Sequence, residues 1–265
     1  MIPHSIPRVA FISGAARRLG RATALALAEA GFAIAVHYRG SAEAVAALVA
    51  DIRARGSDAA AIVGDLADEA ALHSLIGRAA AALGPVGVLV NNASTFTRDE
   101  WDDATAASWQ HHMAPNLRAP FVLTQHFARD LPAAAEGVVV NMLDARVWAP
   151  SGHLLTYALS KSALWALTQQ LALALAPRIR VNGIGPGPAL QSRLESAEQF
   201  AADARALPLG RPTSPEEIAR AVLMILGLPS LTGQMLALDG GMHLSRSALG
   251  LDGHVGMSFS APAGD

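Results

Sequence analysis

Short runs rich in valine and isoleucine alternate along the chain with longer alanine- and leucine-rich stretches of helical period. The runs predict strands at Val9–Ser13, Ala33–His37, Ala60–Gly64, Gly87–Asn91, Val138–Asn141, Ile179–Gly183 and Met235–Leu238. They are apolar nearly throughout, which is typical of parallel strands in a sheet that is covered on both faces. The alternation therefore predicts repeated βαβ units and an α/β fold.

The helical patterns between these runs predict helices at Leu19–Ala30, Ala42–Arg55, Asp68–Leu83, Thr105–Asp130, Leu155–Leu175 and Pro215–Leu226. We expect the fourth helix to be kinked at Pro115 and Pro120. The sequence Ser-Pro-Glu-Glu at 214–217 favours a helix start, with an N-cap serine, a proline in the first turn and acids near the positive end of the dipole.

The length of 265 residues suits a single domain, which we place at 1–244. Residues 188–214 carry prolines, polar residues and a weak helical pattern, so this substrate loop is either a mobile cover over a site or an ordinary surface excursion. Residues 245–265 are rich in Gly, Ser and Ala, which predicts a frayed tail or an arm on a neighbouring subunit.

Composition excludes several classes of function. The chain has no cysteine, which excludes disulfides, cysteine nucleophiles and thiolate metal sites, and His153 is not in a metal-ligand spacing, so we expect no metal. A formal net charge of -2 makes nucleic acid an unfavourable partner. With no apolar stretch near the roughly 18 residues of a membrane span and no secretory signal at 1–8, we expect a cytoplasmic protein without a membrane partner.

The first predicted strand runs directly into a turn of small residues between Gly14 and Gly20, where a helical pattern begins. Such a turn lets a pyrophosphate approach backbone N–H groups at the positive end of a helix. The spacing differs from that of the GxGxxG fingerprint, so a plain glycine-rich turn is an equal alternative.

The second strand ends in residues 37–41, His-Tyr-Arg-Gly-Ser, without the acid that accepts ribose hydroxyls in NAD sites. Arg39, His37, Ser41 and the arginines of the first turn can hold a 2′-phosphate through charge-assisted hydrogen bonds, which favours NADPH over NADH. The alternative is that Arg39 is a solvated surface charge. Asp65 follows the third strand and either accepts from an adenine amino group or caps the next helix.

Tyr157 and Lys161 stand at positions i and i+4 of the fifth predicted helix, on one face and one turn apart. A nearby cation favours phenolate, so we expect Lys161 to lower the pKa of Tyr157 toward working pH, where the phenol can act as a general acid. As a bare pattern, a surface pair is the alternative.

Between residues 8 and 243 the sequence resembles the short-chain dehydrogenase/reductase family. The matching pieces follow the family's order: Gly14 to Gly20, Asp65-Leu66, residues 91–94 (Asn-Asn-Ala-Ser), Asn116, Tyr157 with Lys161, Pro186-Gly187 and residues 239–241 (Asp-Gly-Gly). The resemblance implies a Rossmann-type, doubly wound parallel sheet of about seven strands that binds NAD(P)H. It also implies a homotetramer in which the fourth and fifth helices pack across subunits.

The resemblance implies roles for single residues. Tyr157 donates the proton, Lys161 holds the nicotinamide ribose, and Asn116 anchors a water in the proton relay. The expected cofactor contacts are Gly14, Arg18, Leu19, Gly20, His37, Tyr38, Arg39, Ser41, Asp65, Leu66, Asn92, Ala93, Ser94, Tyr157, Lys161, Pro186 and Gly187.

Three departures from the common pattern narrow the resemblance to the branch of pteridine and dihydromonapterin reductases. Arg18 replaces the usual middle glycine of the loop, Ser94 replaces the last glycine of Asn-Asn-Ala-Gly, and Asp144 replaces the serine of the catalytic set. Gly40 stands where members of this branch carry another arginine. We expect the neighbouring Arg39 to take over the role of that arginine.

A pterin is a flat bicycle, and Phe96 matches the aromatic residue that sandwiches it against the nicotinamide. Ser94 and Arg18 are expected to bind its polar edge, and Asp144 beside Tyr157 is expected to hold and relay the proton that a ring nitrogen takes up. The alternatives are that Phe96 is core packing and that Asp144 caps a turn or pairs with Arg146.

The sequence therefore predicts an NADPH-dependent reductase of a dihydropterin, delivering hydride to C6 and a proton to N5. A carbonyl reductase or alcohol dehydrogenase that acts on a sugar, polyol or oxo-ester is the second hypothesis. A catalytically idle NADP-binding protein is the third, and the presence of Asn116, Tyr157 and Lys161 weighs against it.

Overall fold

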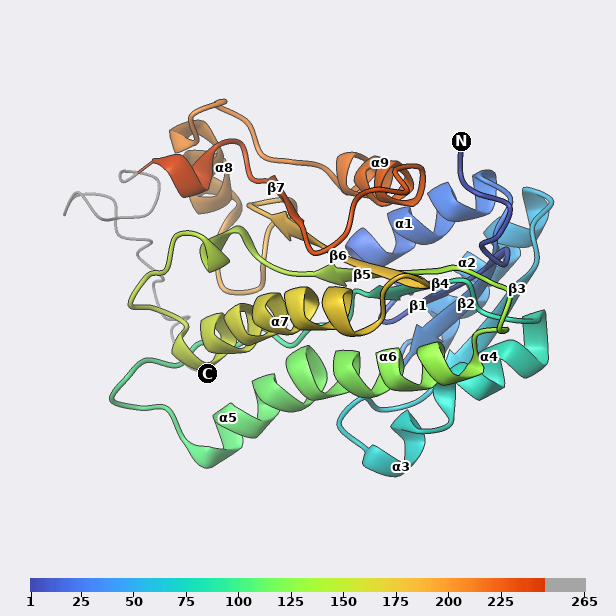
Figure 1. Cartoon of the computed structure of the whole chain (residues 1–265). Helices are drawn as coiled ribbons and strands as arrows, with labels where there is room; N and C mark the ends of the chain where they lie inside the picture. Colours follow the sequence, from blue (N-terminus) through green and yellow to red (C-terminus); the bar gives the residue numbers. More distant parts are fainter. Residues whose placement is uncertain (246–265) are drawn as a thin grey trace.

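The computed structural model describes residues 1–245, in which seven strands form one parallel sheet flanked by helices (Figure 1). The strands are β1 (Val9–Ile12), β2 (Ala33–Tyr38), β3 (Ala59–Val63), β4 (Val88–Asn91), β5 (Gly137–Met142), β6 (Ile179–Pro186) and β7 (Met235–Leu238). Their order is β3-β2-β1-β4-β5-β6-β7, and every neighbouring pair is parallel. The predicted Rossmann-type α/β fold is confirmed. Of the predicted tail at 245–265, residues 246–265 lie outside the described residues.

Helices cover both faces of the sheet (Figure 1). One layer contains α1 (Arg18–Glu29), α2 (Ala42–Ala54) and α9 (Pro215–Leu226), and the other contains α4 (Leu75–Leu83), α6 (Ala119–Asp130) and α7 (Leu155–Ala174). Outside these two groups lie α3 (Glu69–Leu72), α5 (Ala106–Met113), α8 (Ala197–Ala206) and single turns at Ala145–Val147 and Met242–Leu244.

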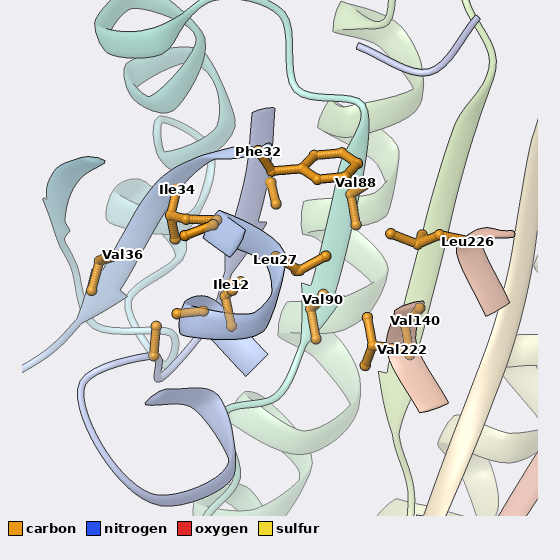
Figure 2. Close-up of a cluster of buried hydrophobic side chains, with 14 of the residues drawn as sticks. Ile12, Leu27, Phe32, Ile34, Val36, Val88, Val90, Val140, Val222 and Leu226 are labelled. Atoms are coloured by element: carbon orange, nitrogen blue, oxygen red, sulfur yellow. The ribbon is translucent and has the colours of Figure 1, made fainter. Parts of the chain in front are cut away.

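Alternating strand residues pack into the two layers, because successive side chains of a strand point to opposite faces. Ile12 of β1 and Val90 of β4 join Leu27 and Val222 in the first layer, as Figure 2 shows. Phe11, next to Ile12, joins the second layer. Burial on both faces explains why the strands read as continuous apolar runs.

The position of the functional groups follows from the strand order. The chain proceeds from β1 to β2 and β3 on one side and then returns to place β4 on the other side of β1. At such a switch point the connections after two adjacent strands diverge, and a crevice opens at the carboxyl ends of the strands. The turn after β1 and the segment after β4 meet at this crevice.

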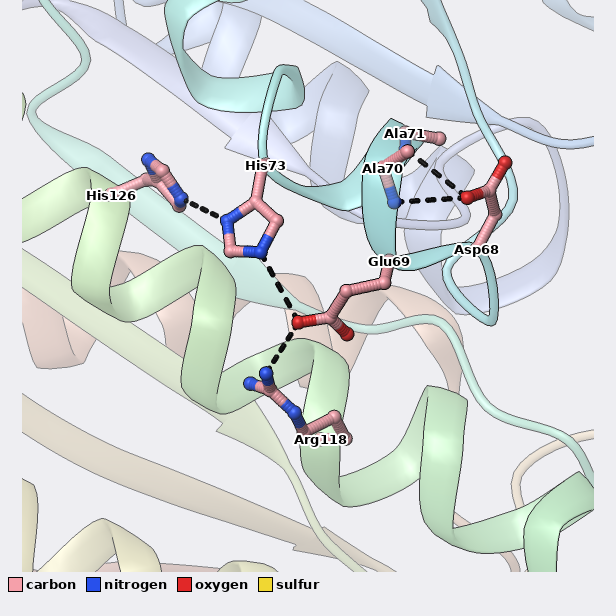
Figure 3. Close-up of polar contacts among 7 residues, drawn as sticks. All are labelled: Asp68, Glu69, Ala70, Ala71, His73, Arg118 and His126. Carbon is pink, nitrogen blue, oxygen red and sulfur yellow. Dashed lines mark hydrogen bonds and ion pairs between the residues drawn. The ribbon is translucent and has the colours of Figure 1, made fainter.

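The prediction of a single third helix is wrong, because the segment forms two helices, α3 and α4, which are separated at His73 and Ser74. Asp68 caps α3 by accepting from two backbone N–H groups. Polar contacts then hold α3 to the helical segment of residues 114–130 (Figure 3). His73 Nδ1 lies 2.8 Å from His126 Nε2, and Arg118 donates to Glu69.

The predicted fourth helix is interrupted at its prolines. A π-helical turn at Ala114–Arg118 joins α5 to α6, with Pro115 inside the turn and Pro120 in the first turn of α6. Such π turns recur at functional sites, and this one contains the buried Asn116. The substrate loop at 188–214 contains a helix, α8, of which the sequence shows only a weak pattern.

Across residues 1–245, no helix combines the length and the apolar character that a membrane span requires.

The start of α9 gives a stability prediction. Ser214 forms a capping box in which its hydroxyl accepts from Glu217 N and the Glu217 carboxylate accepts from Ser214 N. Replacing Ser214 by alanine is expected to lower the free energy of unfolding by about 1 kcal/mol, measured by urea denaturation. Ser41→Ala is the control, because Ser41 precedes α2 without a capping hydrogen bond from its side chain. Equal losses in the two variants would contradict the assignment.

Candidate active site

The glycine turn after β1 packs directly against the end of β4. Gly14 has a φ of +62°, and a Cβ on Gly20 would lie 2.6 Å from Gly14 O and 2.7 Å from Asn92 Nδ2. Asn92 Nδ2 donates to Ser13 O at 2.9 Å and to Gly14 O at 3.2 Å. The glycines are therefore required by contact between two backbone segments, and they leave the turn's outer surface open to a ligand.

An outer cleft lies beside this turn. Its lining comprises Gly14, Arg17, Arg18, Leu19, Gly20, His37, Arg39, Asp65, Leu66, Asn92, Ala93, Ser94, Thr95 and Pro115. Most of the residues predicted from sequence to contact the cofactor are thus brought together here. Arg17 is one of the turn arginines expected to hold a 2′-phosphate, whereas Thr95 and Pro115 were not predicted. Tyr38 and Ser41 are not among the lining residues, and Tyr38 packs against the core instead.

His37 lines the outer cleft as a buried side chain, and its predicted contact with a 2′-phosphate stays a prediction. The side chain is 2% exposed, and burial lowers its pKa to about 4. Its Nδ1 accepts from Gly14 N at 3.1 Å, and its Nε2 donates to Gly64 O at 3.2 Å. His37 is therefore a neutral residue that fixes the glycine turn.

Arg39 and Asp65 lie at the rim of the outer cleft. Arg39 Nη1 is 3.7 Å from Asp65 Oδ2, and the Arg39 side chain is 67% exposed, so its guanidinium can reach a ligand. Asp65 Oδ1 accepts from Ala67 N and closes a turn. Helix capping, one of its two predicted roles, belongs instead to Asp68.

An inner cleft adjoins the outer one, and the two share Arg18, Leu19, Asn92 and Ser94. Its remaining lining is Phe96, Met142, Leu143, Asp144, Arg146, Tyr157, Lys161, residues 186–190, Ser192, Glu195, Asp203 and Met242. The predicted catalytic residues Asp144, Tyr157 and Lys161 and the predicted substrate contact Phe96 thus lie in one cleft.

Tyr157 forms a hydrogen bond with Asp144, the carboxylate that replaces the usual serine of the catalytic set. Its hydroxyl donates to Asp144 Oδ2 at 2.9 Å, and the ring of Phe96 meets its ring edge-on at 4.7 Å between centroids. Asp144 also caps the turn at 145–147 through Arg146 N and pairs with the Arg146 guanidinium. Asp144 therefore caps the turn and pairs with Arg146, which were the alternatives to a catalytic role, and it also contacts Tyr157.

The expectation that Lys161 lowers the pKa of Tyr157 is wrong for this structure. Burial and then the charge of Asp144 raise the pKa of Tyr157 well above its ordinary value. Lys161 Nζ donates to Met142 O at 2.8 Å and lies 5.8 Å from the centre of the tyrosine ring. Burial lowers the pKa of Lys161 itself to about 8.

The amide of Asn116 connects the segment after β4 to α7. Its Oδ1 accepts from Thr95 N at 2.9 Å and from Ser94 Oγ at 3.1 Å. Its Nδ2 donates to Thr95 O and to Ser160 Oγ. The side chain therefore acts as a clamp, and its predicted role as the anchor of a water stays a prediction.

A buried chain of polar groups behind Phe96 and Tyr157 was missed by the sequence analysis. Thr97 N donates to His112 Nε2, so His112 Nδ1 carries the proton and donates to Thr156 Oγ1 at 2.6 Å. The Thr156 hydroxyl in turn donates to Asp99. The chain fixes the neighbours of Phe96 and Tyr157 relative to each other, and no residue spacing in the sequence indicates it.

The substrate loop is attached to the glycine turn through Arg18, which has a φ of +52°. Its guanidinium donates to Leu190 O at 3.1 Å and to Gln191 O at 3.0 Å. The left-handed backbone explains why glycine is favoured at this position. The loop also brings Glu195 and Asp203 into the inner cleft, which the sequence did not predict because both are far from the other site residues along the chain.

Comparison with known proteins agrees with this geometry. Residues 14–243 match the family profile described as enoyl-(acyl carrier protein) reductase. The FabG 3-oxoacyl-[acyl-carrier-protein] reductase of Staphylococcus aureus (strain Mu50) is 31% identical over 254 residues, which cover 89% of this chain and 98% of that protein. The chain belongs to the short-chain dehydrogenase/reductase family.

Solved structures of this family superpose closely on the chain. The short-chain dehydrogenase/reductase from Serratia marcescens has a TM-score of 0.83 and 33% identity over 89% of this chain and 98% of its own. The FolM alternative dihydrofolate reductase 1 from Brucella suis, solved in complex with NADP, has a TM-score of 0.87 and 40% identity, covering 89% of this chain and 95% of its own.

The titration of Tyr157 can be measured directly, because the chain has two tyrosines and Tyr38→Phe leaves only Tyr157. In that background, Asp144→Asn is expected to lower the pKa of Tyr157, since it removes a charge that opposes the phenolate. The measurement is phenolate absorbance against pH, with circular dichroism to confirm the fold. Asp203→Asn, in the same cleft, is the control and should leave the midpoint in place. An unchanged midpoint in Asp144→Asn would refute the coupling.

Proposed function

We propose that this short-chain dehydrogenase/reductase is an NADPH-dependent reductase of a dihydropterin. The observation that carries the proposal is the hydrogen bond from the Tyr157 hydroxyl to the Asp144 carboxylate, beside the ring of Phe96. A ketone reductase needs only a hydroxyl donor at position 144. A carboxylate that can hold and relay a proton suits a reaction in which a ring nitrogen is protonated.

The residues of the outer cleft fit an NADP-type cofactor. The close contact between Gly20 and Asn92 holds the glycine turn at the N-terminus of α1, where backbone N–H groups favour a pyrophosphate. Arg39, with its exposed guanidinium, and Arg17 would hold the 2′-phosphate. The NADP complex of the Brucella suis protein supports this choice of cofactor.

The bound cofactor would supply hydride to C6 of the dihydropterin. The electron pair of the C6=N5 bond moves to N5, which takes the proton of the Tyr157 hydroxyl. Asp144 accepts a hydrogen bond from that hydroxyl and is placed to return a proton to it. Phe96 forms an aromatic wall on which the bicycle stacks, with Ser94 and Arg18 in the same lining as polar contacts.

A carbonyl reductase is the second candidate, and the relative that favours it is the 3-oxoacyl reductase of Staphylococcus aureus. The aspartate at position 144 weighs against it. The third hypothesis, an idle NADP-binding protein, is weakened by the close arrangement of Tyr157, Asp144 and Lys161 in one cleft.

The deciding experiment is NADPH oxidation by the purified protein, offered dihydromonapterin and dihydrobiopterin beside a panel of ketones and aldehydes. We expect turnover of the pterins, with a loss of about 100-fold or more in Tyr157→Phe, the range for removal of a general acid. Turnover of carbonyls alone would reject the pterin assignment. No turnover of any substrate would favour the idle NADP-binding protein.

The choice of cofactor has its own test. Arg39→Ala is expected to raise the KM for NADPH by about tenfold or more, because a charge-assisted hydrogen bond to the 2′-phosphate is lost, and to leave the KM for NADH nearly unchanged. Arg55→Ala is the control, since Arg55 is also exposed but pairs with Glu29 outside both clefts. Equal effects of Arg39→Ala on NADPH and NADH would contradict the role.

The predicted homotetramer and cytoplasmic location stay predictions. Exposed apolar side chains on the helices expected to pack across subunits, Trp109 of α5 and Leu159 and Leu173 of α7, support the assembly. The mass of the protein in solution distinguishes a tetramer from a single 27.4 kDa chain.

A further inference from the structure

The carboxylate of Asp144 is shared between two donors. Its Oδ2 accepts from the Tyr157 hydroxyl at 2.9 Å and from Arg146 Nη1 at 3.2 Å, and its Oδ1 accepts from Arg146 N at 2.8 Å. The side chains of Asp144 and Arg146 are 11% and 18% exposed, so little solvent separates the charges. One residue thus binds both oxygens of the carboxylate, through its backbone and through its side chain.

The local turn makes this arrangement rigid. Asp144 is the N-cap of the turn at Ala145–Val147, so the carboxylate cannot leave Arg146 without breaking the cap. Arg146 also lines the inner cleft beside Tyr157. Its guanidinium therefore acts on the Tyr157 hydroxyl through Asp144, whose carboxylate accepts hydrogen bonds from both groups.

Other charged groups face Arg146. Glu195 and Asp203 approach from the substrate loop, and both interact electrostatically with its guanidinium. Tyr157 and Lys161 approach from α7. His243, in the turn at 242–244 that packs against the turn of Arg146, is paired with Asp239 at 2.7 Å. Lys161 has its own hydrogen bond to Met142 O, whereas Arg146 contacts the carboxylate directly.

We propose that Arg146 is a positioning residue that keeps Asp144 ionised and accepting, so that one carboxylate oxygen holds the Tyr157 hydroxyl in place for proton transfer. The inference rests on the proposed reduction, in which this pair delivers the proton. A carboxylic acid buried beside a phenol without a countercharge favours its protonated form and is a weak acid. The guanidinium reverses that preference, because an opposite charge at this distance favours the ionised carboxyl group.

The test compares the pH dependence of kcat/KM in the wild type and in Arg146→Met, with whichever substrate the wild type reduces. We expect Arg146→Met to move the alkaline fall of activity upward by about one to three pH units, because the variant removes a cation that lowers the pKa of Tyr157. Arg146→Lys keeps a positive charge and should restore most of the wild-type profile. Arg193→Met is the matched control, because Arg193 belongs to the substrate loop but does not line the inner cleft.

A second measurement needs no turnover. Infrared difference spectra should show a protonated carboxyl band at neutral pH in Arg146→Met that is absent from the wild type and lost again in Arg146→Met with Asp144→Asn. NADPH binding, followed by fluorescence, shows that the variants are folded. An unshifted pH profile together with no new band would overturn the proposal. Failure of dihydropterin turnover in the wild type would instead overturn the proposed function and leave this readout available.

Discussion

The contact between the turn after β1 and the segment after β4 is the constraint on which the site depends. Ser13 Oγ accepts from Asn92 N and from Ala93 N, both at 2.9 Å, and the amide of Asn92 bonds back to the turn. These bonds join two segments that are far apart in sequence, at the place where the strand order reverses. A Cβ on Gly14 would lie 3.0 Å from Ala93 Cα, so the two backbones approach closely, and Asn92 and Ser94 beside this contact line both clefts.

The polar groups at the carboxyl ends of the strands are fixed by partners within the protein. Asn116 clamps the segment after β4 to α7. The hydrogen-bonded side chains of Asp99, Thr156 and His112 join the same segment to α7 and α5. A buried polar network of this kind costs free energy unless every member is bonded, and a bonded one holds a single geometry. This explains how Phe96 and Tyr157 keep an edge-on contact at the mouth of a cleft.

The sequence predicts those parts of the structure that depend on local pattern. Strands buried on both faces require apolar runs, and the serine predicted as the N-cap of α9 caps that helix in the structure. The meeting of Asp144, Tyr157 and Lys161 in one cleft is consistent with the roles that the resemblance implies. Local pattern does not show burial, so it could not predict that His37 is neutral, with a pKa lowered to about 4 by its buried position in β2.

Besides burial, the sequence could not predict contacts between segments that are far apart in the chain. Asp203 reaches the inner cleft from α8, a helix with a weak pattern, and residues beside the break between α3 and α4 make polar contacts with the helical segment of residues 114–130. The expected effect of Lys161 on Tyr157 failed for the same reason. Spacing places the two on one helix face, but the hydrogen bond to Met142 O on β5 decides where the ammonium lies.

The electrostatics of the inner cleft follow from the exchange of a serine for an aspartate. A serine at position 144 would bring no charge to the cleft. Asp144 adds a negative charge that raises the pKa of Tyr157, while burial lowers the pKa of Lys161 to about 8. An ammonium with that pKa loses its charge as the pH rises through about 8, whereas a guanidinium keeps its charge throughout. A carboxylate in this position therefore needs a permanent cation beside it, and Arg146 satisfies that need from two residues away.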